Sequence, residues 1–242
     1  MNAIERARGL LSGVRRLVVL SGAGLSAESG MATFRGAGGL WEGRRVEEVA
    51  TPEGFQRDPA LVWEWYSQRR GQALACRPHP GHEALVAWER RPEAHLVHVT
   101  QNVDGLLQRA GAERVLELHG SLFRVKCSAG CPGEREDLRV PFPHPQPCPR
   151  CGDLLRPAVV WFHEMLPAGI LEEAAREIGL AEVLLVVGTS GVVQPAASLA
   201  DIALGAAIPV LEVNPEETPL SSLADVFLKG PAGKVLPSLL DS

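Results

Sequence analysis

The sequence predicts an α/β protein, a parallel sheet with helices on both faces, and a smaller second unit beside that sheet. Two observations lead to this class. Short apolar runs rich in β-branched residues recur along the chain, and helix-like segments separate several of them, which is typical of a parallel sheet. The runs also show little alternation of polar and apolar residues, as expected for strands buried on both faces. The expected strands are residues 17–20, 95–100, 115–118, 183–187 and 209–213.

Helices are expected between several of these strands, at residues 81–91, 169–178 and 195–204. Two segments break the alternation. Residues 35–77 show loop and helix patterns without a clear strand, and residues 120–156 contain four cysteines and the proline-rich run VPFPHPQPCPRC. We therefore expect these two segments to form the smaller unit.

Length and composition limit the possible functions. The 242 residues are enough for one large core with a small insert, and 45% hydrophobic residues are ordinary for a globular protein. The net charge of −5 provides no basic field for nucleic acid or for an anionic membrane. No apolar run approaches the roughly 20 residues that span a bilayer, and the run 17–20 is too short for a signal peptide. We expect a cytoplasmic protein that binds neither nucleic acid nor membrane.

The first expected strand leads into a glycine-rich turn. Gly22, Gly24 and Ala27 form a Gly-x-Gly-x-x-Ala pattern, whose small residues let the backbone approach a pyrophosphate, and a following helix start would add N–H donors. A tight structural turn is the alternative. A dinucleotide fingerprint also expects an acidic residue at the end of the next strand, about 20 residues on. The stretch WEGRRVEEVA does not resemble a strand end, so a ribose would be bound by other residues.

Two late strands end in residues that suit this role. Gly188, Thr189 and Ser190 follow the strand at 183–187, and Asn214 follows the strand at 209–213. In open α/β sheets ligands lie beyond the carboxyl ends of the strands. Each match alone is more often an ordinary turn. Together with the first loop, these small, hydroxyl and amide residues indicate a site for ribose and phosphate.

Two further strand ends carry polar side chains. Gln101, Asn102 and Asp104 follow the strand at 95–100, although Asp104 is an equally good candidate for a helix N-cap. His119 follows the strand at 115–118 and precedes a glycine. A lone histidine is more often structural. Its place level with the other loops favours a base that works near neutral pH.

Four of the five cysteines form two pairs. Cys127-x3-Cys131 is followed after sixteen residues by Cys148-x2-Cys151, a pattern typical of a zinc ribbon. Four thiolates complete a tetrahedral shell without an open position, so one structural Zn²⁺ per chain is expected. Four unrelated buried thiols are the alternative. Cys76 is left over, and we expect it to be a small buried hydrophobe.

Asp58 and Pro59 predict the start of a helix in the stretch DPALVWEWYSQRR. Five residues of this helix share one face: Val62, Trp65, Tyr66, Arg69 and Ala73. One interpretation is a core stripe with Arg69 at its edge and its head in water. Arg69 lies at the centre of the stripe, however, and a guanidinium that faces inward needs an anion. That anion need not be a permanent part of the protein.

Taken together, these stretches resemble the sirtuin family, the NAD-dependent protein lysine deacylases, over nearly the whole chain. The stretches that carry the resemblance are GAGLSAESGMATFRG, TQNVDGL, LHG, the four-cysteine module, RPAVVWFHE, GTS and VNP. Thr33 stands where many members have aspartate. This variant and the Tyr66/Arg69 pair resemble the class III branch of the family.

The resemblance implies a Rossmann-like NAD-binding domain formed by residues 1–34, 78–119 and 158–242, and a small domain formed by residues 35–77 and 120–157. His119 would be the catalytic base. The residues implied to line the NAD site are Gly22, Ala23, Gly24, Ser26, Thr33, Phe34, Arg35, Trp41, Gln101, Asn102, Asp104, Gly188, Thr189, Ser190, Asn214 and Ala232. Those implied to contact the substrate are Tyr66, Arg69, Val160, Trp161 and Phe162. His163 departs from the family, where glycine is common, and could alter peptide preference.

The implied activity is NAD-dependent removal of succinyl, malonyl, glutaryl and acetyl groups from lysines of proteins or peptides, by a monomeric enzyme. Nicotinamide and O-acyl-ADP-ribose would be released. Arg69 would bind the carboxylate of an acidic acyl group with two N–H groups, and Tyr66 would donate a third hydrogen bond. We therefore expect a preference for acidic acyl groups, with some deacetylation retained.

Three other functions are considered. They are protein mono-ADP-ribosyl transfer, an NAD-sensing module without turnover, and a zinc-ribbon protein that binds nucleic acid. The acidic charge and the single tyrosine disfavour nucleic-acid binding, because basic and stacking surfaces are lacking. His119 disfavours a pure sensor. A protein that only bound the cofactor would need no basic side chain at this position.

Overall fold

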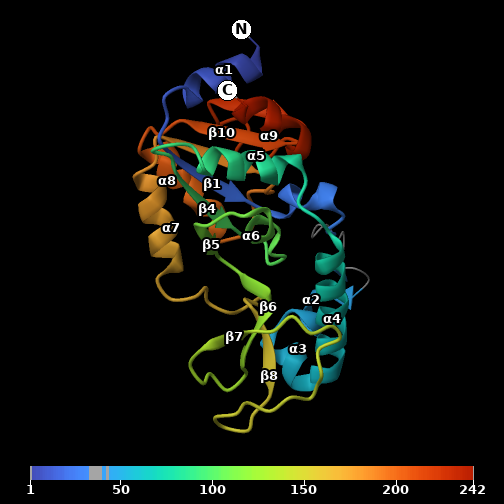
Figure 1. Cartoon of the computed structure of the whole chain (residues 1–242). Coiled ribbons are helices and arrows are strands. Elements are labelled where there is room, and N and C mark those ends of the chain that lie inside the picture. Colours follow the sequence, from blue (N-terminus) through green and yellow to red (C-terminus); the bar gives the residue numbers. More distant parts are fainter. Residues whose placement is uncertain (1, 33–39, 42–43, 242) are drawn as a thin grey trace.

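The computed structural model describes residues 2–32, 40–41 and 44–241. It has a six-stranded parallel sheet at one end and a three-stranded antiparallel sheet at the other (Figure 1). The parallel sheet has the order β11-β10-β9-β1-β4-β5. Its strands are β1 (Arg16–Ser21), β4 (His95–Thr100), β5 (Val115–Glu117), β9 (Val183–Val187), β10 (Val210–Asn214) and β11 (Val226–Lys229). The predicted α/β class is confirmed, and β11 is a strand that was not predicted.

Helices cover both faces of the parallel sheet, as predicted. Successive side chains of β1 alternate between the two cores, with Leu17 and Val19 in one and Val18 and Leu20 in the other. The first core is closed by α1 (Ala3–Leu11), α5 (Pro80–Glu89) and α9 (Ala232–Leu240). The second is closed by α7 (Ile170–Gly179), η3 (Ala196–Ser198) and α8 (Leu199–Gly205). The helices expected at 81–91, 169–178 and 195–204 are thus confirmed, whereas α1 and α9 were not predicted.

The strand order reverses between β1 and β9. From β1 the chain adds β4 and β5 on one side, and later adds β9, β10 and β11 on the other. All neighbouring pairs are parallel, so the carboxyl ends of these strands meet at one edge of the sheet. In such sheets the crevice at the point of reversal is where ligands bind.

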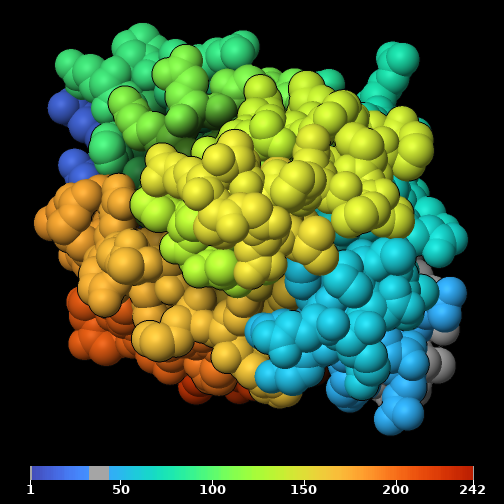
Figure 2. All heavy atoms as spheres, turned by 90° about the horizontal axis from the view of Figure 1, so that it is seen from below, coloured from blue at the N-terminus to red at the C-terminus, as the bar shows by residue number. Residues whose placement is uncertain are grey.

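The other end of the molecule combines the two segments that interrupt the strand–helix rhythm. The antiparallel sheet has the order β7-β6-β8 and packs beside three helices (Figure 1). Figure 2 shows this end from below, with the residues near 140 packed directly against the helices. The strands are β6 (Gly120–Cys127), β7 (Glu134–Glu136) and β8 (Leu155–Val159), and the helices are α2 (Val46–Val49), α3 (Pro52–Arg57) and α4 (Pro59–Ala75).

The start of α4 agrees with the sequence. Asp58 Oδ1 accepts a hydrogen bond from the Leu61 N–H at 2.9 Å, and Pro59 occupies the first helical position. Two expectations were wrong. Residues 35–77 contain a short hairpin of β2 (Leu40–Trp41) and β3 (Arg44–Arg45). No α-helix begins directly after the glycine turn in the described residues. Two short 3₁₀ turns, η1 (Ala23–Leu25) and η2 (Ala27–Ser29), follow it instead, and η2 ends at Gly30 in the left-handed conformation.

Within the described ranges, the structure contains no helix that is both long enough and apolar enough to cross a bilayer.

Candidate active site

The loops after β1 and β9 touch at the point where the strand order reverses. The Gly24 N–H donates to the Gly188 carbonyl at 2.8 Å. A Cβ on Gly24 would lie 2.7 Å from Gly188 Cα, and one on Gly188, where φ is 59°, would lie 2.4 Å from Leu25 N. Such approaches exclude a side chain at either position. These glycines are therefore required for contact between the two loops, a reason that the sequence pattern did not reveal.

Side chains from the loop after β4 join the strand ends to one another. Asn102 Nδ2 donates to the Gly22 carbonyl at 3.0 Å and to Ser26 Oγ at 3.1 Å. Gln101 Nε2 donates to Thr189 Oγ1 at 3.1 Å. The structure thus brings the polar residues after β1, β4 and β9 into one network at the carboxyl edge of the sheet.

The helix that follows Asp104 begins one residue later than the N-cap alternative for Asp104 requires. Its Oδ1 accepts the N–H of Leu106 at 2.9 Å, at the start of α6 (Leu106–Ala110), while Gly105 occupies the N-cap position itself. The side chain is buried, and burial raises the pKa of the Asp104 carboxyl, against the lowering effect of the Leu106 amide and the Ser26 hydroxyl. Asp104 therefore anchors α6 and also contributes a buried carboxyl beside Ser26.

His119 follows β5 at the same edge of the sheet. Its Nδ1 lies 3.1 Å from the Gln101 carbonyl oxygen. A carbonyl only accepts, so Nδ1 carries the proton and Nε2 is the basic nitrogen. The ring is half-buried, and burial lowers the pKa of His119 below its ordinary value, although the bond to Gln101 opposes this. At neutral pH the imidazole is thus neutral and able to accept a proton at Nε2.

The remaining cofactor candidates lie further along the same edge. Asn214 is buried at the end of β10, where its Nδ2 donates to the Thr189 carbonyl at 2.8 Å. Ala232 is buried at the first position of α9, and the next residue, Gly233, donates its N–H to Glu28 Oε2 at 2.5 Å. Sequence reasoning missed Glu28, whose contact joins η2 to the start of α9. Ser190 is exposed.

Four predicted cofactor positions cannot be placed in this arrangement. Thr33, Phe34 and Arg35 lie outside the residues that the structure describes. Trp41 belongs to β2, and its side chain likewise lies outside what is described.

Tyr66 and Arg69 lie on a buried face of α4. The Tyr66 hydroxyl accepts a hydrogen bond from Trp161 Nε1 at 2.8 Å, and the Arg69 guanidinium carbon lies 5.0 Å from the centre of the Trp65 ring. Burial raises the pKa of Tyr66 to about 12, so the phenol is neutral. Burial raises the pKa of both Tyr66 and Asp104, and the charge of Arg69 opposes that rise at each.

The segment 160–162 follows β8 and approaches both halves of the site. The Val160 N–H donates to the His119 carbonyl at 2.9 Å, and the Phe162 N–H donates to the Ala50 carbonyl at 3.0 Å. Trp161 is buried, whereas Phe162 is 43% exposed. His163 adopts a φ of 68°, a conformation that favours glycine. The structure therefore supplies a backbone reason for glycine at this position.

The four paired cysteines converge at one point. Their Sγ atoms all lie within 4.8 Å of one another, and all four are free thiols. Around a tetrahedral zinc with Zn–S bonds of about 2.3 Å, neighbouring sulfurs would lie about 3.8 Å apart. The Cys127 and Cys151 sulfurs lie 3.5 Å apart, so the cluster fits such an ion. Cys76 lies apart from the cluster and is buried, as expected.

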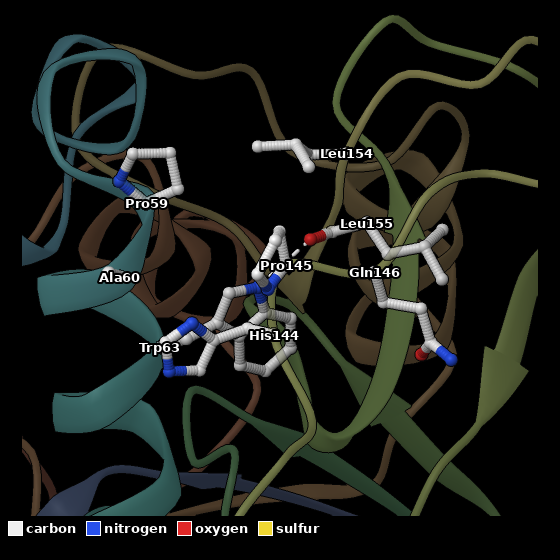
Figure 3. Close-up of a pocket in the computed structure, with 8 residues that line it drawn as sticks. All are labelled: Pro59, Ala60, Trp63, His144, Pro145, Gln146, Leu154 and Leu155. Atoms are coloured by element: carbon white, nitrogen blue, oxygen red, sulfur yellow. Dashed lines mark hydrogen bonds between the residues drawn. The ribbon is translucent and has the colours of Figure 1, made fainter.

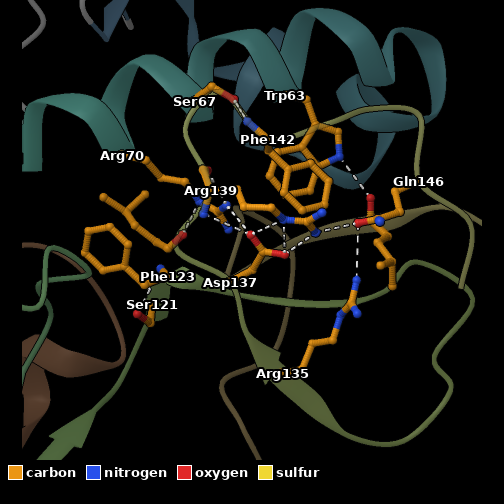
Figure 4. A network of polar contacts seen from close by, with 12 residues as sticks. Trp63, Ser67, Arg70, Ser121, Phe123, Arg135, Asp137, Arg139, Phe142 and Gln146 are labelled. Atoms are coloured by element: carbon orange, nitrogen blue, oxygen red, sulfur yellow. Dashed lines mark hydrogen bonds and ion pairs between the residues drawn. The ribbon is translucent and has the colours of Figure 1, made fainter. Parts of the chain in front are cut away.

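A polar network ties the cysteine module to α4 (Figure 4). Arg70 Nε donates to the Leu122 carbonyl at 2.5 Å, and its Nη1 lies 3.6 Å from Asp137 Oδ1. Arg139 binds the same carboxylate through Nε, at 3.1 Å from each oxygen. Ser67 Oγ accepts the Phe142 N–H at 3.0 Å. Sequence reasoning did not identify this network, whose members are spread over residues 67 to 142.

One cavity lies in the half of the molecule that holds the antiparallel sheet (Figure 3). It has a volume of about 200 Å³ and lies between the first turns of α4 and the segment before β8, with Trp63, His144 and Leu155 in its wall. A smaller cavity of about 100 Å³ adjoins Gln101 and Thr189. Of these two cavities, the smaller one is lined by predicted site residues and the larger one is not.

Comparisons with known proteins agree with this geometry. A family model described as the Sir2 family matches residues 22–195. The NAD-dependent protein deacylase 2 of Pyrobaculum aerophilum is 51% identical over 233 residues, which cover 96% of this chain and 92% of that protein. A solved structure of a Sir2 homologue–NAD complex superposes with a TM-score of 0.91 at 45% identity, covering 98% and 92% of the two chains. Another, a Sir2 protein bound to a myristoylated histone peptide, gives 0.78 at 35%, covering 99% and 95%.

Proposed function

The chain belongs to the Sir2 family, and from this premise we propose that it is an NAD-dependent protein deacylase acting on acylated lysine side chains. Its similarity to the Pyrobaculum aerophilum deacylase extends over nearly the whole length of both chains. The observation that carries the proposal is the place of His119. A neutral imidazole, oriented by the Gln101 carbonyl, lies at the sheet edge where a nucleotide is expected.

The residues at this edge fit NAD. The loops after β1 and β9 meet through glycines, and amide and hydroxyl groups of Asn102, Ser26 and Asn214 gather around them. We assign the binding of the nucleotide to these loops. When bound, NAD supplies nicotinamide as a leaving group and ADP-ribose as the acceptor of the acyl group. A solved complex of a homologue with NAD supports this assignment.

His119 is assigned the role of general base. Its Nε2 accepts a proton from the reacting hydroxyl group, while Nδ1 keeps its hydrogen bond to the Gln101 carbonyl, so the ring orientation is maintained during the transfer. Asn102 and Asp104 hold the surrounding loop in place. The four cysteines would hold Zn²⁺ in a closed shell, and the metal therefore supports the fold and takes no part in bond making.

We further propose that peptides bind along the segment 160–162 and that acidic acyl groups reach Tyr66 and Arg69. A buried guanidinium and a neutral phenol together suit the carboxylate of a succinyl, malonyl or glutaryl group. The myristoylated histone peptide bound to a related protein supports an acylated peptide as substrate. The division into two domains, the cytoplasmic location and the monomeric state stay predictions.

The proposal is tested with wild type and His119→Ala, supplied with NAD and acyl-lysine peptides. Released nicotinamide and free lysine should appear together for wild type, and His119→Ala should lower turnover by at least ~100-fold while NAD binding measured by calorimetry persists. Because burial lowers the pKa of His119, the acidic limb of the wild-type pH profile should lie below the usual ~6.5 of histidine.

Two outcomes would contradict the proposal. Near-normal turnover by His119→Ala would show that His119 is not the general base. Nicotinamide release with ADP-ribose attached to protein, and without free lysine, would indicate mono-ADP-ribosyl transfer instead.

A further inference from the structure

An ion pair outside the predicted site joins the two ends of the turn after β8. Its members are Arg156, in β8, and Glu164, beyond the turn. Arg156 Nη1 and Glu164 Oε1 lie 2.5 Å apart, and Nη2 and Oε2 lie 2.9 Å apart. The arginine side chain is 6% exposed and the glutamate side chain 21% exposed. A bidentate ion pair of this kind sets the orientation of the guanidinium and of the carboxylate as well as their separation. It therefore fixes the geometry of residues 157–163.

Both partners of this pair also contact Trp161. The Arg156 guanidinium carbon lies 3.3 Å from the centre of the Trp161 ring, and Glu164 Oε2 accepts the Trp161 backbone N–H at 2.9 Å. Arg156 Nη2 donates in addition to the Val159 carbonyl at 2.9 Å. Trp161 is thus held by the Arg156 guanidinium stacked on its ring and by the Glu164 carboxylate bound to its backbone N–H.

The orientation of this indole sets the direction of hydrogen bonding at Tyr66. Trp161 Nε1 lies 2.8 Å from the Tyr66 hydroxyl oxygen. An indole N–H can only donate, so the tyrosine oxygen is the acceptor and its own proton is directed to a different acceptor. Because the phenol has a pKa of about 12, it keeps this proton at neutral pH.

The positive charge of Arg156 also strengthens the hydrogen bond from Trp161 to Tyr66. A cation over an aromatic face is attracted by its electrons, and hydrogen bonds in series polarise one another. The Trp161 N–H next to this cation becomes a better donor, and the Tyr66 hydroxyl that accepts from it becomes a better donor in turn. Such a donor favours an acceptor with negative charge.

We propose that Arg156 and Glu164 are positioning residues for acyl selection, because they hold Trp161 so that Tyr66 presents its hydroxyl proton to a carboxylate on the acyl group. This inference rests on the proposed function. Neither residue acts on the acyl group directly. Their influence passes through Trp161 to Tyr66.

The first test needs no substrate. Tyr66 is the only tyrosine among the 242 residues, so a protein labelled with ¹³C at the ring carbon that bears the hydroxyl gives one resonance for this residue. Glu164→Gln keeps the size of the side chain and an oxygen for the Trp161 N–H, but removes the charge that holds Arg156. The resonance should shift or broaden in Glu164→Gln and in Trp161→Phe.

The matched control is Glu177→Gln. Glu177 is another ion-paired, largely buried carboxylate, with its Oε2 3.3 Å from Arg16, and it lies on α7. Its substitution should leave the Tyr66 resonance in place. An unchanged resonance in folded Glu164→Gln would overturn the proposal.

The second test compares succinyl and acetyl peptides of one sequence. Glu164→Gln should lower the succinyl-to-acetyl ratio of kcat/KM by roughly tenfold, the scale of one hydrogen bond, and should have no such effect in a Tyr66→Phe background. An equal loss on both peptides, or the same loss of ratio without the hydroxyl, would show a merely structural role. If the wild type itself lacks a succinyl preference, the proposed acyl choice fails, and the tyrosine resonance alone decides whether the ion pair orients Tyr66.

Discussion

Two adjacent arginines on α4 lie in different surroundings. Arg70 is 0% exposed and faces the cysteine module, where the Leu122 carbonyl and the Asp137 carboxylate contact its guanidinium. Arg69 is 4% exposed and is turned about 100° around the helix, over the Trp65 ring and near Tyr66. The partners of Arg70 join α4 to the antiparallel sheet, whereas the surroundings of Arg69 are those of the proposed acyl site.

The comparison shows that burial of a charge does not by itself reveal its role. Burial lowers the pKa of Arg70 to about 10, and the Asp137 carboxylate opposes that effect, as in a structural ion pair. Burial raises the pKa of Asp104, in the loop after β4 that also carries Gln101 and Asn102, and the charge of Arg69 opposes this rise. One face of α4 thus joins the helix to the antiparallel sheet, and the other carries the two residues of the proposed acyl site.

The largest expected effect comes from breaking the module that rests on the Arg70 face. Cys148→Ser should release zinc and remove a large part of the roughly 10 kcal/mol that a structural zinc site contributes to folding. Metal content by mass spectrometry and the thermal midpoint measure this. Cys76→Ser, which changes a cysteine outside the cluster, should keep the zinc. Unchanged zinc and an unchanged midpoint in Cys148→Ser would refute the four-thiolate site.

Arg70→Met acts on the same face without touching the metal. It should lower the free energy of unfolding by about 3 kcal/mol, because removal of one member of a buried network leaves its partners without their hydrogen bonds. Urea unfolding measures the loss. The succinyl-to-acetyl ratio of the folded variant should match that of wild type. A changed ratio with normal stability would reverse the roles assigned to the two arginines.

Arg69→Met tests the other face. It should weaken desuccinylation by roughly 1.5–3 kcal/mol in kcat/KM, the scale of a charge-assisted hydrogen bond, and affect deacetylation much less. Matched succinyl and acetyl peptides give the measurement, and Arg70→Met is the control for loss of a neighbouring buried arginine. An equal loss on both peptides would mean that Arg69 only shapes the helix.

The smallest effect concerns the turn after β8. His163→Gly should relieve a left-handed conformation that costs about 1–2 kcal/mol, while glycine loses about 0.5–1 kcal/mol more conformational entropy on folding, so a net gain of about 0.5 kcal/mol is expected. Chemical denaturation measures it. Ala207→Gly, at a φ of 54° far along the chain, should give a similar gain and leave the KM for peptides unchanged. A destabilised His163→Gly would show that the imidazole makes contacts that outweigh the strain.

The parallel sheet and the cysteine cluster could be predicted because each depends on a local pattern. A buried strand is apolar wherever it occurs, and two cysteine pairs at ribbon spacing restrict the geometry strongly. The two short strands at 40–41 and 44–45 were missed, since two-residue strands carry no periodicity. The strand β11 and helix α9 were missed as well, although VFLK and AGKVLPSLL are each mostly apolar.

By itself, the sequence determined the alternation of strands and helices, the residues at the strand ends, the four thiols and the start of α4 at Pro59. Tertiary structure decided which partners these residues meet. Arg69 and Arg70 are the same amino acid one position apart, and only the packing of α4 directs one over the Trp65 ring and the other toward the Leu122 carbonyl. Arg156 and Glu164 owe their contact with Trp161 to the turn between them. Such contacts depend on the path of the backbone in space, which no local sequence pattern specifies.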